Sequence, residues 1–413
     1  MQSHSFQRLR SLAALTIMGS LVSAAPSMAA RFTAAEIGYD NALLSSFNLV
    51  TLGSYTNTSG VTTTVGGRSI VEGNVTNGAN SGTEFCSTCS GNATSAVDST
   101  GKLYGALTVF GNLASGSNGG FSVGYNPSNG VTTAGTTYIG GTASGYFYAG
   151  NKQNLNVVGS ASGLAVDYAN NIATSQSSFA GTRTNTATGT ITTSANGNTA
   201  ASVFPFTSSA LTSQVTRLSS GIAALPGSPG VTAQSLPSAS SGSGLFTANA
   251  DWTSNGKTYG VVTTTIANLV AQTATSFTGI NNGSNAATFV IVTGAAANTT
   301  YTLPNLNSYA DAGKVIYEFV DATSLKFAGA WNGSILAPLA SISQAASCSY
   351  ASCSINGTVI VNAIAQSQAI TSTFLFAGDL SGLIPEPASM ALFGLGAAAA
   401  AIVRRRRRAV DQS

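Results

Sequence analysis

Charged residues are scarce in this chain of 413 residues, because Asp, Glu, Lys and Arg together make up only 7% of it, against about 25% in an ordinary soluble domain. Hydrophobic residues make up 43%, and 46 residues are glycine. This composition is too apolar for a disordered chain. It predicts a folded protein whose surface is neutral and rich in hydroxyl and amide groups, and it disfavours a cytosolic enzyme.

Histidine is almost absent, since His4 is the only one and lies in a segment that we expect to be removed. A mature chain without histidine excludes Ser-His-Asp and Cys-His catalysis and histidine-based metal sites. The nearest group of acids is Asp311, Glu318 and Asp321, and we expect Glu318 to lie on a solvated strand edge. We therefore predict no catalytic residues, no cofactor, no metal site and no enzymatic activity.

Cysteine is also rare, with two local pairs that consist of Cys86 with Cys89 and Cys348 with Cys353. In an exported chain these thiols should be oxidised, and their closeness in sequence favours a disulfide within each pair. A redox-active Cys-x-x-Cys centre and a zinc site made by all four thiolates are alternatives that the surrounding sequence does not favour.

Basic residues are concentrated at the two ends of the chain. Residues 31–384 hold nine basic and eleven acidic residues, so the body is weakly acidic and we expect no nucleic-acid partner. The N-terminus carries Arg8 and Arg10, an apolar stretch over 12–25 and then small residues. These three parts are typical of a secretory signal peptide, residues 1–30, that signal peptidase cleaves near Ala29 or Ala30.

At the other end, a Pro-Glu-Pro motif is followed by an apolar run over 388–403 and by five arginines. The residues concerned are Pro385, Glu386, Pro387, Arg404, Arg405, Arg406, Arg407 and Arg408. This order resembles the PEP-CTERM sorting signal of Gram-negative bacteria, over residues 385–408. The resemblance implies processing by an exosortase and delivery to the cell surface or to an exopolysaccharide matrix. The arginines would hold the apolar run in the inner membrane before processing, and an unprocessed C-terminal anchor is the alternative.

The body begins with a predicted helix, because Thr33 and Glu36 have capping-box spacing. A strand over 47–53 should follow it. Short β-prone segments with glycine or asparagine then recur at 69–75, 107–113 and 155–160. The Gly-Asn-apolar triplets at Gly73 and Gly111 are 38 residues apart, which fits two solenoid turns of about nineteen residues. We predict a mainly β protein with a β-solenoid body, and a β-sandwich is the alternative.

The middle of the chain, around 165–250, reads as a helical and loop insert. Residues 165–179 favour a helix, and the polar run to 201 favours a loop or an irregular hairpin. A second helix is predicted by one apolar stripe that ends at Pro226-Gly227 and comprises Leu211, Val215, Leu218, Ile222 and Leu225. We expect this helix to pack along the flank of the solenoid, and a partner-binding helix is the alternative. Residues 228–244 should form a surface loop.

Two segments near the end of the body carry a further resemblance. They are Phe327–Pro338, with Trp331-Asn332-Gly333-Ser334-Ile335-Leu336-Ala337-Pro338 at its core, and Ile355–Val361. Together they look like the choice-of-anchor A domain, with similarity spread over about 42–380 within a domain that we place at 31–380. The resemblance implies an exported domain that is attached by different anchors. The first segment is also similar to ice-binding adhesin solenoids, which carry one long flanking helix.

These observations predict a structural or adhesive protein of the cell surface or matrix whose neutral faces contact exopolysaccharide. An ice-binding or adhesin-type solenoid is the alternative, and a glycan-active hydrolase or lyase is a weaker one, because no two carboxylates are spaced as a pair. The Thr-rich stretches show no Thr ladder at a constant period. Asn-x-Ser/Thr sequons, among them Asn57, Asn282 and Asn332, are candidates for glycosylation or products of composition alone.

Overall fold

The computed structural model describes residues 32–383 with several internal gaps. The gaps fall at 90–101, 103, 118, 127–130, 133–135, 150–153, 162–163, 169–170, 173–182, 186–188, 194–199, 239–243, 273–276, 307–310, 346–347, 349–352 and 366–368. The predicted signal peptide and the Pro-Glu-Pro and arginine residues of the sorting signal lie outside the described residues.

The body opens with helix α2 (Ala34–Ser46), as the capping box predicts. The Glu36 amide donates to Thr33 Oγ1 at 3.2 Å, and the Thr33 amide donates to the Glu36 carboxylate at 2.7 Å. The helix ends where Phe47 adopts an extended conformation and begins strand β1 (Phe47–Thr51). The helix and the first strand are therefore both confirmed.

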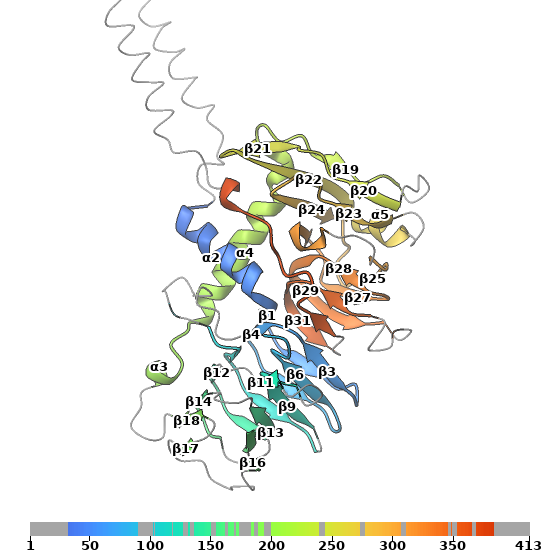
Figure 1. Cartoon of the computed structure of the whole chain (residues 1–413). Coiled ribbons are helices and arrows are strands. Elements are labelled where there is room, and N and C mark those ends of the chain that lie inside the picture. The colour runs from blue at the N-terminus through green and yellow to red at the C-terminus, as the bar shows by residue number, and fades with distance from the viewer. Residues whose placement is uncertain are drawn as a thin grey trace, which may run out of the picture.

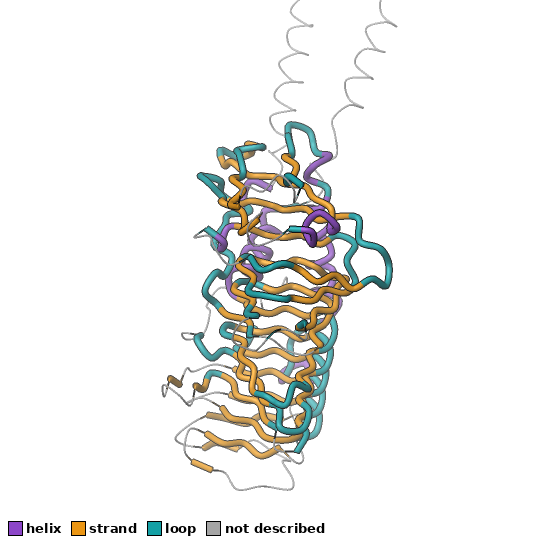
Figure 2. Tube along the Cα trace, turned by 90° about the vertical axis from the view of Figure 1, so that its right-hand side faces the viewer, coloured by secondary structure: helices purple, strands orange, loops and turns teal. Residues whose placement is uncertain are grey.

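Most strands stack as parallel rungs of a β-solenoid, as Figure 2 shows. The strand pairings divide the rungs into three faces. Face A consists of β22 (Lys257–Thr265), β24 (Ala287–Thr293), β26 (Val315–Phe319), the first part of β29 (Ser334–Gln344), the first part of β31 (Val359–Ala365), β1, β4 (Arg68–Val71), β7 (Leu107–Val109), β12 (Thr136–Ile139), β14 (Asn154–Val157) and β18 (Gly189–Thr193). The predicted solenoid is thus confirmed, and the β-sandwich alternative is not the fold.

The two other faces are built in the same way. Face B consists of β25 (Thr300–Leu303), β27 (Ser324–Phe327), the second parts of β29 and β31, β2 (Tyr55–Asn57), β5 (Val75–Asn77), β8 (Leu113–Ser115) and the start of β13 (Ala143–Ala149). Face C consists of β28 (Trp331–Asn332), β30 (Ile355–Asn356), β32 (Ile370–Thr371), β3 (Thr62–Val65), β6 (Gly82–Phe85), β9 (Gly120–Val123), the rest of β13 and β15 (Leu164–Tyr168).

Short elements complete the described chain. They are the hairpin β10 (Tyr125–Asn126) and β11 (Val131–Thr132), β16 (Asn171–Ile172), β17 (Arg183–Asn185), β19 (Gln234–Ser235), β20 (Gly244–Thr247), β21 (Trp252–Ser254), β23 (Phe277–Asn281), α3 (Ala200–Val203), α4 (Ser208–Ala223), α5 (Ile266–Ala271) and the 3-10 turns η3 (Leu225–Gly227), η5 (Ala312–Lys314) and η6 (Ser381–Leu383). Both β19 and β21 pair with β22, the last rung at one end. They cover an edge that could otherwise pair with another chain.

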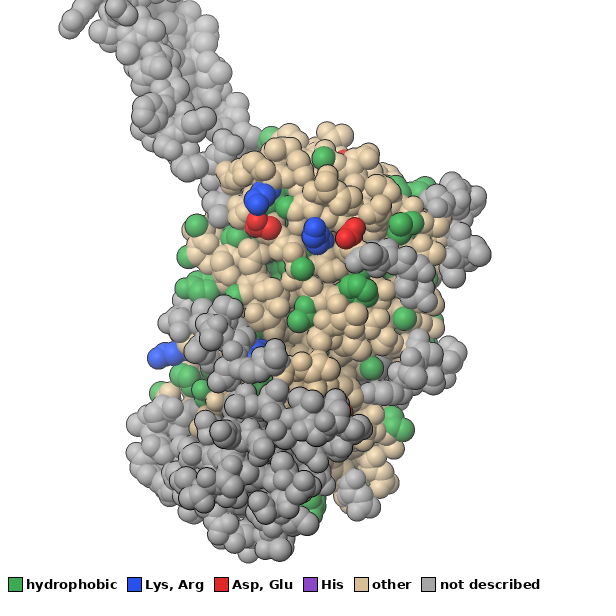
Figure 3. All heavy atoms as spheres, viewed as in Figure 1, with side chains coloured by type: hydrophobic (Ala, Val, Ile, Leu, Met, Phe, Trp, Pro, Cys, Tyr) green, Lys and Arg blue, Asp and Glu red, His purple; other side chains and the backbone are tan. Residues whose placement is uncertain are grey.

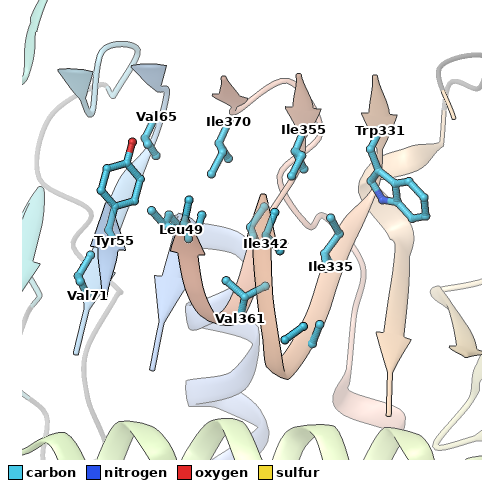
Figure 4. Close-up of a cluster of buried hydrophobic side chains, with 14 of the residues drawn as sticks. Leu49, Tyr55, Val65, Val71, Trp331, Ile335, Ile342, Ile355, Val361 and Ile370 are labelled. Carbon is cyan, nitrogen blue, oxygen red and sulfur yellow. The ribbon is translucent and has the colours of Figure 1, made fainter. Parts of the chain in front are cut away.

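The order of the rungs along the solenoid differs from their order in the sequence. The first half runs from β1 to β14 in one direction, and α4 then returns along face A (Figure 1). The second half runs from β22 to β31 and ends beside the first strand, where Leu49 pairs with Val359. We call this contact between β1 and β31 the seam. Figure 4 shows side chains of both halves, such as Leu49 and Val361, in one core.

Hydrogen bonds from buried polar groups hold the seam together. The Asn48 side-chain amide donates to the carbonyl oxygens of Gly357, at 3.0 Å, and Thr371, at 2.7 Å. The Thr358 hydroxyl donates to the carbonyl oxygen of Leu44 at 2.5 Å. Asn48 and Thr358 are both fully buried, and a buried polar group without a partner is costly. The two halves are therefore joined by specific bonds as well as by backbone pairing.

Face A is buried on both sides over most of its rungs. Alternate residues of its strands, such as Leu49 and Val359, point into the solenoid, while Val50 and Ile360 belong to a second apolar cluster with helices α2 and α4. All five apolar residues that predict α4 are buried in this second cluster. Strands covered on both faces read as continuous apolar runs. The prediction that α4 packs on the solenoid flank is confirmed.

Glycines mark the corner between faces A and B at five successive rungs. The backbone amides of Gly73, Gly111, Gly141 and Gly159 each donate to the carbonyl of the glycine one rung away, beginning with Gly53. Gly73 and Gly111 are therefore neighbours, separated by one turn with a long insertion. The prediction of two turns of nineteen residues was wrong because loop length varies from rung to rung, whereas the corner geometry does not.

The close stacking of the corner glycines predicts that a larger residue at this corner destabilises the fold. A Cβ at Gly111 would lie 2.6 Å from the carbonyl oxygen of Gly73, so Gly111→Ala should lower the free energy of unfolding by about 1–3 kcal/mol. Gly38→Ala is the matched control, because a Cβ there meets nothing within 4 Å and should raise it by about 0.5–1 kcal/mol. Chemical denaturation measures both values. Equal effects at the two positions would contradict the corner assignment.

The predicted helix over 165–179 is wrong where the structure describes it. Residues 164–168 form strand β15, which pairs in parallel with β13, and Asn171–Ile172 form β16. Pairing with an existing sheet edge outweighs a weak helical preference, since strand formation depends on the tertiary neighbours. The polar run that follows contains an antiparallel hairpin of β17 and β18, as the sequence predicts. Within 228–244, the short strand β19 interrupts the predicted loop.

The two predicted disulfides are confirmed. Cys86 is joined to Cys89, and Cys348 is joined to Cys353. Cys86 and Cys89 follow strand β6, and the other bond closes the loop after β29. Both therefore fix loops that leave the rungs.

Candidate functional site

Face B offers a row of mostly small side chains on the outside of the solenoid. The row has one residue from each of eight rungs, in the order Thr302, Lys326, Ser343, Ala365, Thr56, Thr76, Ala114 and Ser144. Ile342 pairs with Ile364, so the residues that follow them, Ser343 and Ala365, are aligned as well. We call this set the face B row, and it crosses the seam between the two halves.

Strand alternation explains why this row is exposed. Residues that precede the row positions, such as Tyr55, Val75 and Leu113, point inward and are fully buried. Thr76 and Thr302 are exposed, and Thr56 and Ser144 are half-buried. Because parallel rungs are about 4.8 Å apart, the eight positions extend over about 34 Å. The inward residues thus hold the outward ones in a regular line.

The face B row is almost free of charge. Lys326 is its only charged member, and the other seven are Thr, Ser or Ala. On the described part of the face shown in Figure 3, acidic and basic side chains are likewise few. Hydroxyl groups donate and accept hydrogen bonds, and methyl groups contribute apolar contact. The row is therefore suited to many weak contacts with an extended polar surface.

On face C, several polar side chains bond to one another from rung to rung. The Asn356 side-chain amide donates to Asn332 Oδ1 at 2.6 Å, and the Thr371 hydroxyl donates to Asn356 Oδ1 at 2.7 Å. Two sequons are also structural, because Asn57 and Asn282 are fully buried. Their side-chain amides donate to backbone carbonyls at 2.7 and 2.6 Å. The Asn57, Asn282 and Asn332 side chains therefore serve the fold, and none is presented for glycosylation of the folded body.

The sequence predicts that Glu318 lies on a solvated strand edge, and this prediction is wrong. Glu318 lies beneath helix α4. Its side chain is fully buried, and the Ser219 hydroxyl donates to Glu318 Oε1 at 2.6 Å. Burial raises the pKa of Glu318 well above its usual value, against the lowering effect of the Ser219 bond. Face A is covered by α4 at this position, which strand alternation alone could not reveal.

This burial gives Glu318 a pH-dependent effect on stability. The pKa of Glu318 is higher in the folded than in the unfolded chain. Its contribution to the free energy of unfolding is therefore complete below about pH 4.3, the ordinary pKa of a glutamate. This contribution is lost as the pH rises through the pKa of the folded state. Glu318→Gln keeps a neutral group there, so its melting temperature should exceed that of the wild type at pH 8 but not at pH 4. Asp321→Asn, at an exposed acid, is the control. A gain for Glu318→Gln that is equal at both pH values would contradict this account.

The other acids of the predicted group do not join Glu318. Asp321 is exposed and accepts a bond from the Gly294 amide at 3.2 Å. Asp311 precedes the turn η5. In the described ranges, no three His, Cys, Asp or Glu side chains are arranged to hold a metal ion. No helix within the described part of the chain is both long and apolar enough to cross a membrane, and the apolar run 388–403 lies outside it.

Sequence reasoning missed the face B row. Thr56 and Thr76 are 20 residues apart, but Thr76 and Ala114 are 38 apart and Ala114 and Ser144 are 30 apart. A search for a constant period cannot find such a row. The corner glycines are the sequence signal that predicts this row, since each row position on β2, β5, β8 and β13 lies three residues after a corner glycine.

Comparison with known proteins agrees with these features. A model of the PEP-CTERM protein-sorting motif matches residues 383–408, which implies an exported cell-surface protein that is processed by an exosortase. No curated protein and no solved structure matches the chain. A second model, described as "Putative Ice-binding-like adhesive domain", matches residues 40–371. Since this match covers more than half of the chain, the protein belongs to the family of ice-binding-like adhesive domains.

Proposed function

We propose that the mature body is an adhesive component of the cell surface or extracellular matrix, and that the face B row binds exopolysaccharide. The observation that carries this proposal is the row itself, which presents small, neutral side chains at seven of its eight aligned rungs, the exception being Lys326. A polysaccharide chain repeats hydroxyl groups along its length. Many weak hydrogen bonds to such a chain add up when one surface binds several sugar units.

The route to the surface follows from the two chain ends. Signal peptidase removes residues 1–30, and the apolar run 388–403 holds the precursor in the inner membrane of a Gram-negative bacterium until exosortase cleaves near Pro385-Glu386-Pro387. The arginines Arg404 to Arg408 keep the C-terminus in the cytoplasm. The body is then the exported domain of a choice-of-anchor A protein. Mass spectrometry of the mature protein from its native host tests both cleavages, and a full-length product would contradict this route.

We further propose that the body is not an enzyme. The mature chain has no histidine, and Glu318 is buried beneath α4 while Asp321 is exposed on a separate turn. These acids cannot act as a carboxylate pair of the kind that cleaves glycosidic bonds. Release of reducing ends from neutral or acidic polysaccharides would contradict this proposal.

Ice binding is the second candidate function, because the family is ice-binding-like and the face B row aligns hydroxyl and methyl groups at successive rungs. The row is less regular than an ice surface requires, since it mixes Thr, Ser and Ala and carries the exposed side chain of Lys326. An ice-recrystallisation assay with the mature body, beside a binding assay on the exopolysaccharide of the host, separates the two functions. We expect binding to the polysaccharide and no inhibition of ice growth, and the opposite result would favour ice binding.

A further inference from the structure

The last described residues of the chain pack against the body and end next to the sorting signal. The Asp379 amide donates to the Ala286 carbonyl at 3.1 Å, and the Gly382 amide donates to the Tyr259 hydroxyl at 2.8 Å. We call Asp379–Leu383 the terminal strap. In sequence, only Ile384 separates it from the Pro-Glu-Pro motif.

Further contacts hold the terminal strap against helix α2 and face A. The Leu380 amide donates to Asn41 Oδ1 at 3.2 Å, and the Leu380 and Leu383 side chains are buried in the cluster shared with α2. Lys257 and Asp379 form an ion pair at 3.3 Å. The strap follows the segment that rises along the body to the same end as the start of α2 (Figure 1). It is therefore a docked part of the fold.

The docked strap leaves only a short stretch of chain, between Leu383 and the apolar run, that a processing enzyme could reach. From Leu383 to Ala388, where the apolar run begins, a fully extended chain covers at most about 18 Å. Even a small protein domain is about 30 Å across. If Asp379–Leu383 detach while Ala377 stays bonded to Gly313, the reach from Ala377 to Ala388 more than doubles, to about 40 Å. While the strap is docked, the chain between the folded body and the apolar run is therefore shorter than the width of an enzyme domain.

We propose that the terminal strap gates processing, so that exosortase cleaves the sorting signal only after Asp379–Leu383 have detached from Tyr259, Asn41 and Ala286. This inference rests on the proposed function in one respect, namely that the apolar run lies in the membrane. When cleavage needs a local opening, its rate follows the population of the open form. Weakening the docking should therefore speed processing without changing the motif.

The test is the rate at which full-length precursor becomes mature protein in cells that contain the exosortase, followed by pulse-chase. Tyr259→Phe removes the hydroxyl that accepts from Gly382 and should speed conversion about fivefold. Tyr301→Phe is the matched control, because the Tyr301 hydroxyl also accepts a backbone amide, that of Ala296, at 2.8 Å. Its ring packs against the inner core of the solenoid, whereas Tyr259 and the strap leucines belong to the cluster with α2 and α4. It should leave the rate unchanged.

A second variant separates gating from a general loss of stability. A flexible Gly/Ser linker of about ten residues, inserted between Leu383 and Ile384, supplies the missing reach while the strap stays docked. We expect the linker to speed conversion and to abolish the effect of Tyr259→Phe. An unchanged rate with the linker, in a wild-type precursor that is processed, would overturn the gate. A precursor that stays full length with or without the linker would instead contradict exosortase processing.

Discussion

The double variant Thr76→Glu/Ala365→Glu should retain at most about one tenth of the wild-type binding to exopolysaccharide, a loss of about 1.4 kcal/mol. The two positions flank Thr56 in the face B row, so a polymer that lies along the row must meet both. Each carboxylate would have to lose water on contact without gaining a partner. Both residues are exposed, so the fold should tolerate the change. Equilibrium binding to the immobilised polymer measures the loss.

A control with the same change in charge shows whether the position matters. Thr62→Glu/Thr253→Glu places two glutamates at exposed threonines, one on face C and one on β21 at the end of the solenoid. We expect this variant to bind as the wild type does. Equal losses in the two double variants would show that net charge, and not the face B row, determines binding.

Asn48→Ala should lower the free energy of unfolding by about 2–3 kcal/mol, which is the largest single effect that we expect on stability. The substitution removes two hydrogen bonds across the seam, a buried one to the carbonyl of Gly357 and a part-buried one to the carbonyl of Thr371. It also leaves a small cavity. Because residue 48 and its partners are more than 300 positions apart in the chain, the loss weakens the contact between the two halves. Denaturant unfolding of the disulfide-bonded mature body measures it.

Asn74→Ala is the comparison for the seam. The Asn74 side chain makes a hydrogen bond too, in which its Oδ1 accepts from the Asn112 amide at 2.8 Å, but it is exposed at a corner. Water can replace this bond, so the loss should stay below about 1 kcal/mol. If Asn48→Ala costs no more than Asn74→Ala, the seam does not depend on the buried amide.

Local features of the fold could be predicted from the sequence. The capping box of Thr33 and Glu36 fixes the start of α2, and the apolar stripe from Leu211 to Leu225 fixes α4, because both signals act within a few turns of helix. Short strands separated by glycine pointed to rungs. The disulfides followed from the closeness of the paired cysteines. In each case the interacting groups are near one another in the sequence.

Long-range features could not be predicted. Nothing local indicates that Leu49 pairs with Val359, or that the second half of the solenoid is built from the opposite end. Insertions of different length conceal the register of the face B row, and the same variation led to the wrong turn length at Gly73 and Gly111. The buried position of Glu318 depends on α4, about one hundred residues earlier. Such contacts are decided by packing between distant segments.

The central claim is that a neutral face of this solenoid binds a neutral part of a polysaccharide through hydrogen bonds. The most direct test is a binding isotherm of the mature body on exopolysaccharide purified from its host, at about 0.05 M and about 0.5 M NaCl. We predict saturable binding whose affinity is the same at both concentrations, because salt screens charges and leaves neutral hydrogen bonds almost unaffected. No saturable binding, or binding that disappears at the higher concentration, would contradict the claim.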